Sequence, residues 1–127
     1  MLKTIAVLVG LLVFVTLGFA QQPTITRTVL QQVGISVPGY EVVNARTEIP
    51  AGGTSGRHTH PGEDVTYVME GTLELVIDGM PARTIKAGES FVVSAGKVHS
   101  VTARGARATL ITTFIVEKGK PLATPVQ

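Results

Sequence analysis

The chain has 127 residues, a length that predicts one domain rather than a multidomain protein. Its 11 Lys and Arg residues nearly balance 9 Asp and Glu residues, so the charge does not favour capture of nucleic acid or an anionic membrane surface. The sequence contains no Cys, and a chain without thiols cannot form mispaired disulfides in an oxidising compartment.

Residues 1–20 have the composition of a secretory signal peptide. Lys3 is the only charged residue there, and an uncharged, mostly apolar stretch follows it. Gly18 and Ala20 supply the small side chains that signal peptidase requires just before the cleavage point. The alternative is an uncleaved membrane anchor, but the stretch is shorter than the about 20 residues of a spanning helix. We expect cleavage before Gln21, export to the periplasm or the extracellular space, and no stable membrane insertion after cleavage.

The remaining residues, 21–127, are predicted to be all-β. They include 14 Val, 14 Thr and 7 Ile, and these β-branched side chains pack well on a pleated sheet. No stretch has the apolar periodicity of a helix, whereas short apolar runs bounded by Gly, Pro and Asp recur along the chain. The predicted strands cover residues 25–30, 41–49, 56–60, 64–70, 72–78, 82–86, 90–94, 99–103 and 106–116.

Eight or nine short antiparallel strands predict either a closed barrel or a double-sheet jelly roll, and we favour a small jelly roll. Asp78 and Gly79 have the sequence of a tight hairpin turn. An extended tail is expected over residues 119–125. Because a small barrel has little core with which to cover its edges, we expect a homodimer that pairs through the apolar strands at 25–30 and 110–116.

The three histidines of the chain form a candidate metal site. His58 and His60 are two residues apart, which on a strand places both imidazoles on one face. Asp64 or Glu63 can return a carboxylate to that face after a short turn, and His99 can add a third nitrogen from a distant strand. Imidazole and carboxylate donors favour Fe, Mn, Cu, Ni or Zn over Ca or Mg.

The spacing of these residues resembles the two sequence motifs of the cupin superfamily, as found in its small, exported, single-domain members. The first motif, G-x5-H-x-H-x(3,4)-E-x6-G, is similar to the run formed by Gly52, His58, His60, Asp64 and Gly71. The second motif, G-x5-P-x-G-x2-H-x3-N, is similar to the run formed by Gly88, Ser94, Gly96, His99 and Ala103. The resemblance implies a jelly-roll barrel whose mouth holds a divalent metal.

The same resemblance implies the ligand set, which consists of His58, His60, Asp64 and His99. Asp64 stands where the family has Glu, so its carboxylate is one methylene shorter. It could bind the metal directly or act through a water molecule. Glu63 has the missing length, but strand alternation directs it to the other face unless the preceding turn rotates it inward.

Three functions are compatible with these residues. The first is a metal-dependent enzyme that acts on a small organic molecule. It would be either an isomerase or an oxidoreductase such as a dioxygenase. The second is a non-catalytic module that binds a metal or a small ligand as a carrier or sensor, and the third is a purely structural barrel. The sequence does not identify catalytic residues, and Arg57, next to His58, is the candidate for binding an anionic ligand at the barrel mouth.

Overall fold

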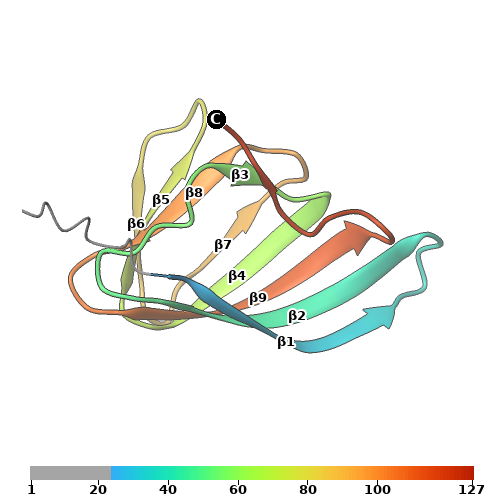
Figure 1. The fold of residues 1–127 in the computed structure, drawn as a ribbon, viewed down its shortest axis with the longest axis horizontal. Coiled ribbons are helices and arrows are strands. Elements are labelled where there is room, and N and C mark those ends of the chain that lie inside the picture. Colours follow the sequence, from blue (N-terminus) through green and yellow to red (C-terminus); the bar gives the residue numbers. More distant parts are fainter. Residues whose placement is uncertain (1–23) are drawn as a thin grey trace, which may run out of the picture.

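The computed structural model describes residues 24–127, so the predicted signal peptide lies outside the described residues. Within this range the chain forms ten strands in two five-stranded antiparallel sheets that enclose one interior (Figure 1). This architecture confirms the prediction of an all-β jelly roll. The search of these residues for a helix long and apolar enough to cross a membrane found none. The strands are β1 (Thr26–Gly34), β2 (Tyr40–Ile49), β3 (His58–Thr59), β4 (Gly62–Glu70), β5 (Thr72–Ile77), β6 (Arg83–Lys86), β7 (Ser90–Val93), β8 (His99–Ala103), β9 (Ala108–Glu117) and β10 (Thr124–Pro125).

The strand order of the first sheet corrects one expectation about the dimer. This sheet has the order β1-β2-β9-β4-β7, and the second has the order β10-β3-β8-β5-β6. Strand β9 pairs with β2 on one side and with β4 on the other, so its residues 110–116 have no free edge to offer a second copy. Strand β1 does lie at an edge, and all nine of its residues are exposed.

Strand alternation explains which side chains enter the interior. On β5, Leu73 and Leu75 are buried while their neighbours are partly exposed. The same period of two buries His99 together with Val101 on β8, and it buries Asp64 on β4. The pattern that builds the apolar core therefore also brings candidate ligands to the inner faces of both sheets.

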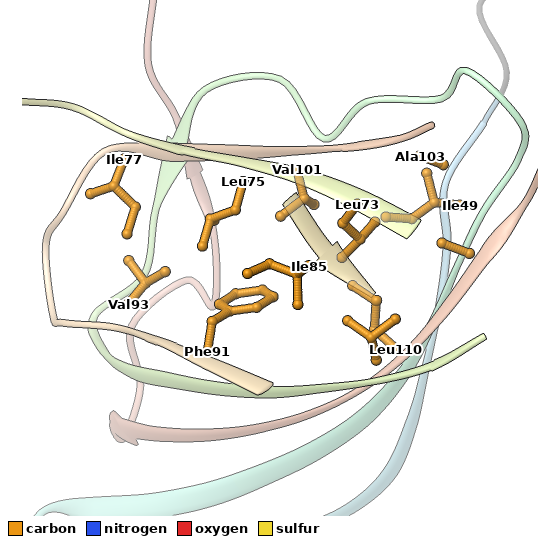
Figure 2. Packing of buried hydrophobic residues seen from close by; sticks show 12 residues of the cluster. Ile49, Leu73, Leu75, Ile77, Ile85, Phe91, Val93, Val101, Ala103 and Leu110 are labelled. Carbon is orange, nitrogen blue, oxygen red and sulfur yellow. The ribbon is translucent and has the colours of Figure 1, made fainter. Parts of the chain in front are cut away.

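The apolar core lies in the space between the sheets (Figure 2). Its twelve buried residues come from both sheets, and Ile25 packs against them from the start of the chain's described part. They are Ile49, Val68, Leu73, Leu75, Ile77, Ile85, Phe91, Val93, Val101, Ala103, Ala108 and Leu110. A smaller cluster lies farther along β2 and β9, and Leu122 packs against it. It consists of Val43, Ala45, Phe114 and Val116.

Two glycines allow β4 to take its place beside β9. A Cβ atom at Gly62 would collide with the backbone carbonyl of Ile115, so this position requires a residue without a side chain. Gly71, at the other end of the strand, has a φ of 84°, a conformation that other L-residues rarely adopt. Gly62 and Asp64 are two residues apart on β4 and both are buried, so they lie on the same, inner face of the strand.

The predicted strands and the observed strands overlap at all nine predicted positions, and strand 99–103 has the same bounds. Two features differ. Strand β1 extends to Gly34, past an irregularity in its pairing with β2 between Val29 and Gln31. The expected tail runs back along β3 and pairs with it as β10, which Figure 1 shows in dark red. The tail pairs with β3, which is far away in the sequence, so local patterns do not reveal β10. The extension of β1 belongs to its hairpin with the next strand, β2.

Candidate metal centre

The fold brings the three histidines together. His58 belongs to β3, His60 follows this strand directly, and His99 begins β8 as the direct cross-strand neighbour of His58. One ring nitrogen of each lies within 4.8 Å of the corresponding nitrogens of the other two. The Nε2 atoms of His58 and His60 are only 3.1 Å apart. Three side chains with metal-binding chemistry thus converge on one point.

Backbone carbonyls fix the orientation and the tautomer of every one of these rings. The Nδ1 atom of His58 is 2.9 Å from the carbonyl oxygen of Gly56, and that of His99 is 3.0 Å from the carbonyl oxygen of Lys97. For His60 the partner is the carbonyl of Leu122, at 2.7 Å. Because a carbonyl can only accept, each Nδ1 carries the hydrogen and each Nε2 of a neutral ring presents a lone pair.

Burial favours the neutral imidazoles of His58 and His60. His58, His60 and His99 are each less than one-tenth exposed. Burial lowers the pKa of His60 to about 4, and it also lowers the pKa of His58, since both sites disfavour the charged ring. Neutral imidazole is the form that binds metals, so at neutral pH the donor atoms of His58 and His60 are ready for coordination.

Asp64 directs its carboxylate toward the same point. Its Oδ2 atom lies 3.5 Å from Nε2 of His60 and 3.5 Å from Nε2 of His99. Its Oδ1 atom accepts a hydrogen bond of 2.6 Å from the hydroxyl of Thr66. Since that hydroxyl gives its hydrogen to Asp64, the 2.6 Å contact between Thr66 and Thr112 has Thr112 as donor. The two threonines therefore hold the carboxylate with one oxygen facing the histidines.

Glu63 faces elsewhere. Its Oε1 atom accepts a hydrogen bond of 3.3 Å from the backbone N–H of Ala95, at an exposed position. The turn after His60 therefore leaves Glu63 on the opposite face of β4, as simple alternation expects. Of the two carboxylates that the sequence offers, the structure brings only Asp64 to the histidines.

The candidate site opens through two adjoining cavities. The inner one has a volume of about 40 Å³ and is lined by the three histidines, Asp64 and Phe114, among others. The outer one, of about 280 Å³, shares His58 with it and reaches the tail that follows β9. The inner cavity has room for an ion with a few small ligand atoms, and the outer one can hold a small organic molecule.

Arg27 is a residue of this site that sequence analysis missed. It lines both cavities, and its guanidinium carbon lies 5.4 Å from the centre of the Phe114 ring. The Phe114 ring in turn lies 4.7 Å from the ring of His60. No motif marks Arg27, because its place depends on the pairing of β1 with β2, though the alternation of Ile25 and Arg27 on one strand face was visible.

Arg57, the arginine that the sequence suggested, also borders the outer cavity, but its charge is already paired. Its guanidinium lies 2.5 Å from Oδ2 of Asp78 and also donates to the carbonyl oxygen of Gln127, at 3.0 Å. The structure thus ties Arg57 to the β5–β6 turn and to the chain's last described residue.

Comparison with known proteins identifies the domain. The sequence profile of the family described as "Cupin domain" matches residues 45–120, a range that contains the four candidate ligands. No curated protein matches the sequence. A cupin superfamily protein from Desulfitobacterium hafniense has a similar structure, with a TM-score of 0.64, 14% identity and coverage of 77% of this chain and 83% of that one.

Two enzymes of known activity share the fold over part of their length. The DMSP lyase DddQ from Ruegeria pomeroyi gives a TM-score of 0.61 at 18% identity, covering 67% of this chain and 43% of that one. An oxalate oxidase gives a TM-score of 0.60 at 30% identity, covering 67% of this chain and 46% of that one. The matched region spans less than half of either enzyme.

Proposed function

Because the chain belongs to the cupin family, we propose that it is an exported, metal-dependent enzyme that acts on a small organic molecule, as an oxidoreductase or an isomerase. The cofactor in this proposal is one divalent transition metal, Fe, Mn, Cu, Ni or Zn. Structural neighbours named for reactions on small molecules, an oxalate oxidase and a DMSP lyase, support this class of function. The proposed metal ligands are His58, His60, Asp64 and His99.

One observation carries the metal proposal. The Nδ1 hydrogens of His58 and His60 are both committed to backbone carbonyls, yet their Nε2 atoms lie 3.1 Å apart. Two lone pairs that face each other at this distance repel, and a cation between or beside them relieves the repulsion. Burial disfavours a proton as that cation, as the lowered pKa of His60 indicates. A metal ion fits the donor set, and the carbonyl-bound Nδ1 atoms are typical of metal-ligating histidines.

When bound, the metal would supply Lewis-acid or redox chemistry at its open positions. The chain's own residues would hold and orient it. His58, His60 and His99 offer ring nitrogens, and Asp64 offers one oxygen while Thr66 holds the other. A substrate would reach the site through the outer cavity, since the two cavities share lining residues.

The second candidate function is a non-catalytic module that binds a metal or a small ligand as a carrier or sensor. It is favoured by the small number of titratable groups near the site. Among the residues described, the inner cavity is lined by no titratable side chain other than the three histidines, Asp64 and Arg27. If the four proposed ligands are engaged with the metal, little remains to act as a separate acid or base.

Metal analysis combined with an activity screen tests both candidates. We expect purified protein to hold close to one transition metal per chain and to lose it when His58, His60 and His99 are replaced together by Ala. The metal-loaded protein should then act on members of a panel of phenols and keto acids, either by consuming oxygen in their presence or by isomerising them. Retention of metal by the triple variant would refute the site, and bound metal without turnover would favour the carrier or sensor.

Export and self-association complete the proposal, and both rest on sequence features. Cleavage after Ala20 predicts an exported chain that begins at Gln21, and a mature mass that still includes Lys3 would indicate an anchor instead. Edge strand β1 exposes Val29 and Leu30, which supports pairing of two copies through this strand. A single monomeric peak in size-exclusion chromatography at micromolar concentration would refute the homodimer.

A further inference from the structure

Arg27 is placed between solvent and the metal centre. Ile25, directly before β1, packs against the apolar core, and Ile25 and Arg27, two residues apart, both line the inner cavity, so the two side chains are directed to the interior. Arg27 lies over the Phe114 ring, at 5.4 Å, and Phe114 packs against His60. The residue as a whole is nevertheless exposed, which leaves its guanidinium open to a ligand that enters from outside.

The guanidinium of Arg27 has no acidic partner within the part of the chain that the structure describes. Four other arginines there form ion pairs, whereas no carboxylate oxygen lies within 4.0 Å of Arg27. Desolvation lowers the pKa of Arg27 and the Asp64 carboxylate raises it, but an arginine this far above neutral pH stays charged. A charged, unpaired and partly desolvated guanidinium gains most from an anionic ligand.

The charge and the lining of the cavities define the class of that ligand. With a divalent metal bound, the positive charges of the metal and Arg27 exceed the single negative charge of Asp64, so the site attracts anions. Ile25, Ala123 and Pro125 give the 280 Å³ outer cavity apolar walls. These walls favour an anion that carries a short carbon skeleton over a fully hydrated inorganic ion.

We propose that Arg27 binds the carboxylate of a small organic acid whose other oxygen-bearing end faces the metal centre. The planar guanidinium fork matches a planar carboxylate through two parallel hydrogen bonds, a match that a tetrahedral phosphate shares only in part. This inference rests on the proposed function for the metal, and it adds the substrate class and the residue that selects it. Arg57 is not that residue, because Asp78 already neutralises it.

The experiment uses Co²⁺-loaded protein and follows the visible absorption of the ion together with calorimetry. The probes are succinate, its neutral analogue succinamide, and inorganic phosphate. Wild type should bind succinate at least tenfold more tightly than succinamide. The Arg27→Gln variant should bind succinate at least tenfold more weakly than wild type and should no longer distinguish it from succinamide. A purely structural role for Arg27 would not remove this discrimination.

The control is Arg83→Gln, which removes the same charge from β6, where Arg83 is exposed and outside both cavities. It should bind succinate as wild type does. Arg27→Lys keeps the charge and most of the side chain, so it should retain a preference for succinate while binding it several-fold more weakly. This variant replaces Arg27→Gln in the test if Arg27→Gln does not fold.

Three results would overturn the inference. Equal succinate binding by wild type and Arg27→Gln would exclude Arg27 while leaving the metal site intact. Tighter binding of phosphate than of succinate, lost in Arg27→Gln, would replace the carboxylate by another anion. Failure of the wild type to take up Co²⁺ or any other transition metal would refute the proposed function itself, and the three failures are distinguishable because metal uptake is measured first.

Discussion

Two adjoining regions of the space between the sheets, the apolar core and the candidate metal site, are built by the same strands but filled with different side chains. In the apolar core, strands β4, β5 and β8 bury aliphatic side chains such as Val68, Leu73 and Val101, which need no partners beyond close packing. In the candidate metal site, β4 and β8 bury Asp64 and His99, whose polar atoms need partners. The Nδ1 atoms of the three histidines and Oδ1 of Asp64 have hydrogen-bond partners in the protein, whereas the Nε2 atoms of His58 and His60 face each other. The apolar core thus stabilises the fold, and this stable fold holds the donor atoms of the candidate metal site close together.

The largest effect on stability is expected from a substitution in the apolar core. Leu73 has no exposed surface, so Leu73→Ala should lower the free energy of unfolding by about 2–5 kcal/mol through lost burial and the cavity left behind. Metal content per folded chain should not change, because Leu73 does not line the site. Urea unfolding and metal analysis of the folded fraction measure the two quantities. Val92→Ala, at a side chain that is 54% exposed, is the control and should change stability by less than about 0.5 kcal/mol.

The pH dependence of the free energy of unfolding should distinguish the candidate metal site from the apolar core. Because burial lowers the pKa of His60 to about 4, the unfolded chain, with an ordinary value of about 6.5, binds the proton at higher pH than the folded chain does. The contribution to stability is therefore complete above pH ~6.5 and is lost as pH falls toward ~4, at no more than about 1.4 kcal/mol per pH unit for this residue.

Urea unfolding of the chelator-treated protein at several pH values between about 7 and 5 tests this linkage. His60→Gln should flatten the pH dependence, and His58→Gln should do so in the same direction, since burial also lowers the pKa of His58. Leu73→Ala should keep the full slope while shifting all values downward. An unchanged slope in His60→Gln would show that this ring does not carry the acid sensitivity.

Much of this comparison could be predicted from the sequence, and the reason is local. Short apolar runs bounded by Gly, Pro and Asp identified the strands, and the spacing of His58, His60 and His99 identified the point where donors gather. What could not be predicted depends on residues distant in the sequence. Arg27 reaches the site only because β1 pairs with β2, which in turn pairs with β9, the strand that carries Phe114. The sequence did not decide between Asp64 and Glu63 as the carboxylate ligand, because it does not specify the geometry of the turn between His60 and β4.

Substitutions at Asp64 test whether its carboxylate belongs to the metal site. If its carboxylate binds the metal, Asp64→Asn should weaken metal affinity tenfold or more, about 1.4 kcal/mol, while Asp64→Glu should hold or tighten it. The asparagine oxygen can still accept from Thr66, so the loss reports on the missing charge. Glu63→Gln is the matched control, since its hydrogen bond from Ala95 N–H survives the change. Calorimetric titration with Zn²⁺ measures all three, and wild-type affinity in both Asp64 variants would leave a three-histidine site.

The smallest expected effect concerns how the three rings are held. His58 and His99 donate to carbonyls two residues away in their own loops, whereas His60 donates to Leu122, 62 residues distant, in the tail beside β3. A chain ending at Lys120 therefore lacks the partner of His60 alone. We expect metal affinity to fall by up to tenfold, because outer hydrogen bonds orient metal-binding rings.

The nitrogen chemical shifts of the three imidazoles in the metal-free protein can isolate that cause. In the shortened chain the shifts of His60 should move toward a mixture of tautomers, while His58 and His99 keep their hydrogens on Nδ1 as in the full chain. A change at all three rings would mean that the tail supports the whole β3 region through its pairing as β10 rather than one ring. An unchanged His60 would mean that the packing of Phe114 against this ring, with centres 4.7 Å apart, is enough to orient it.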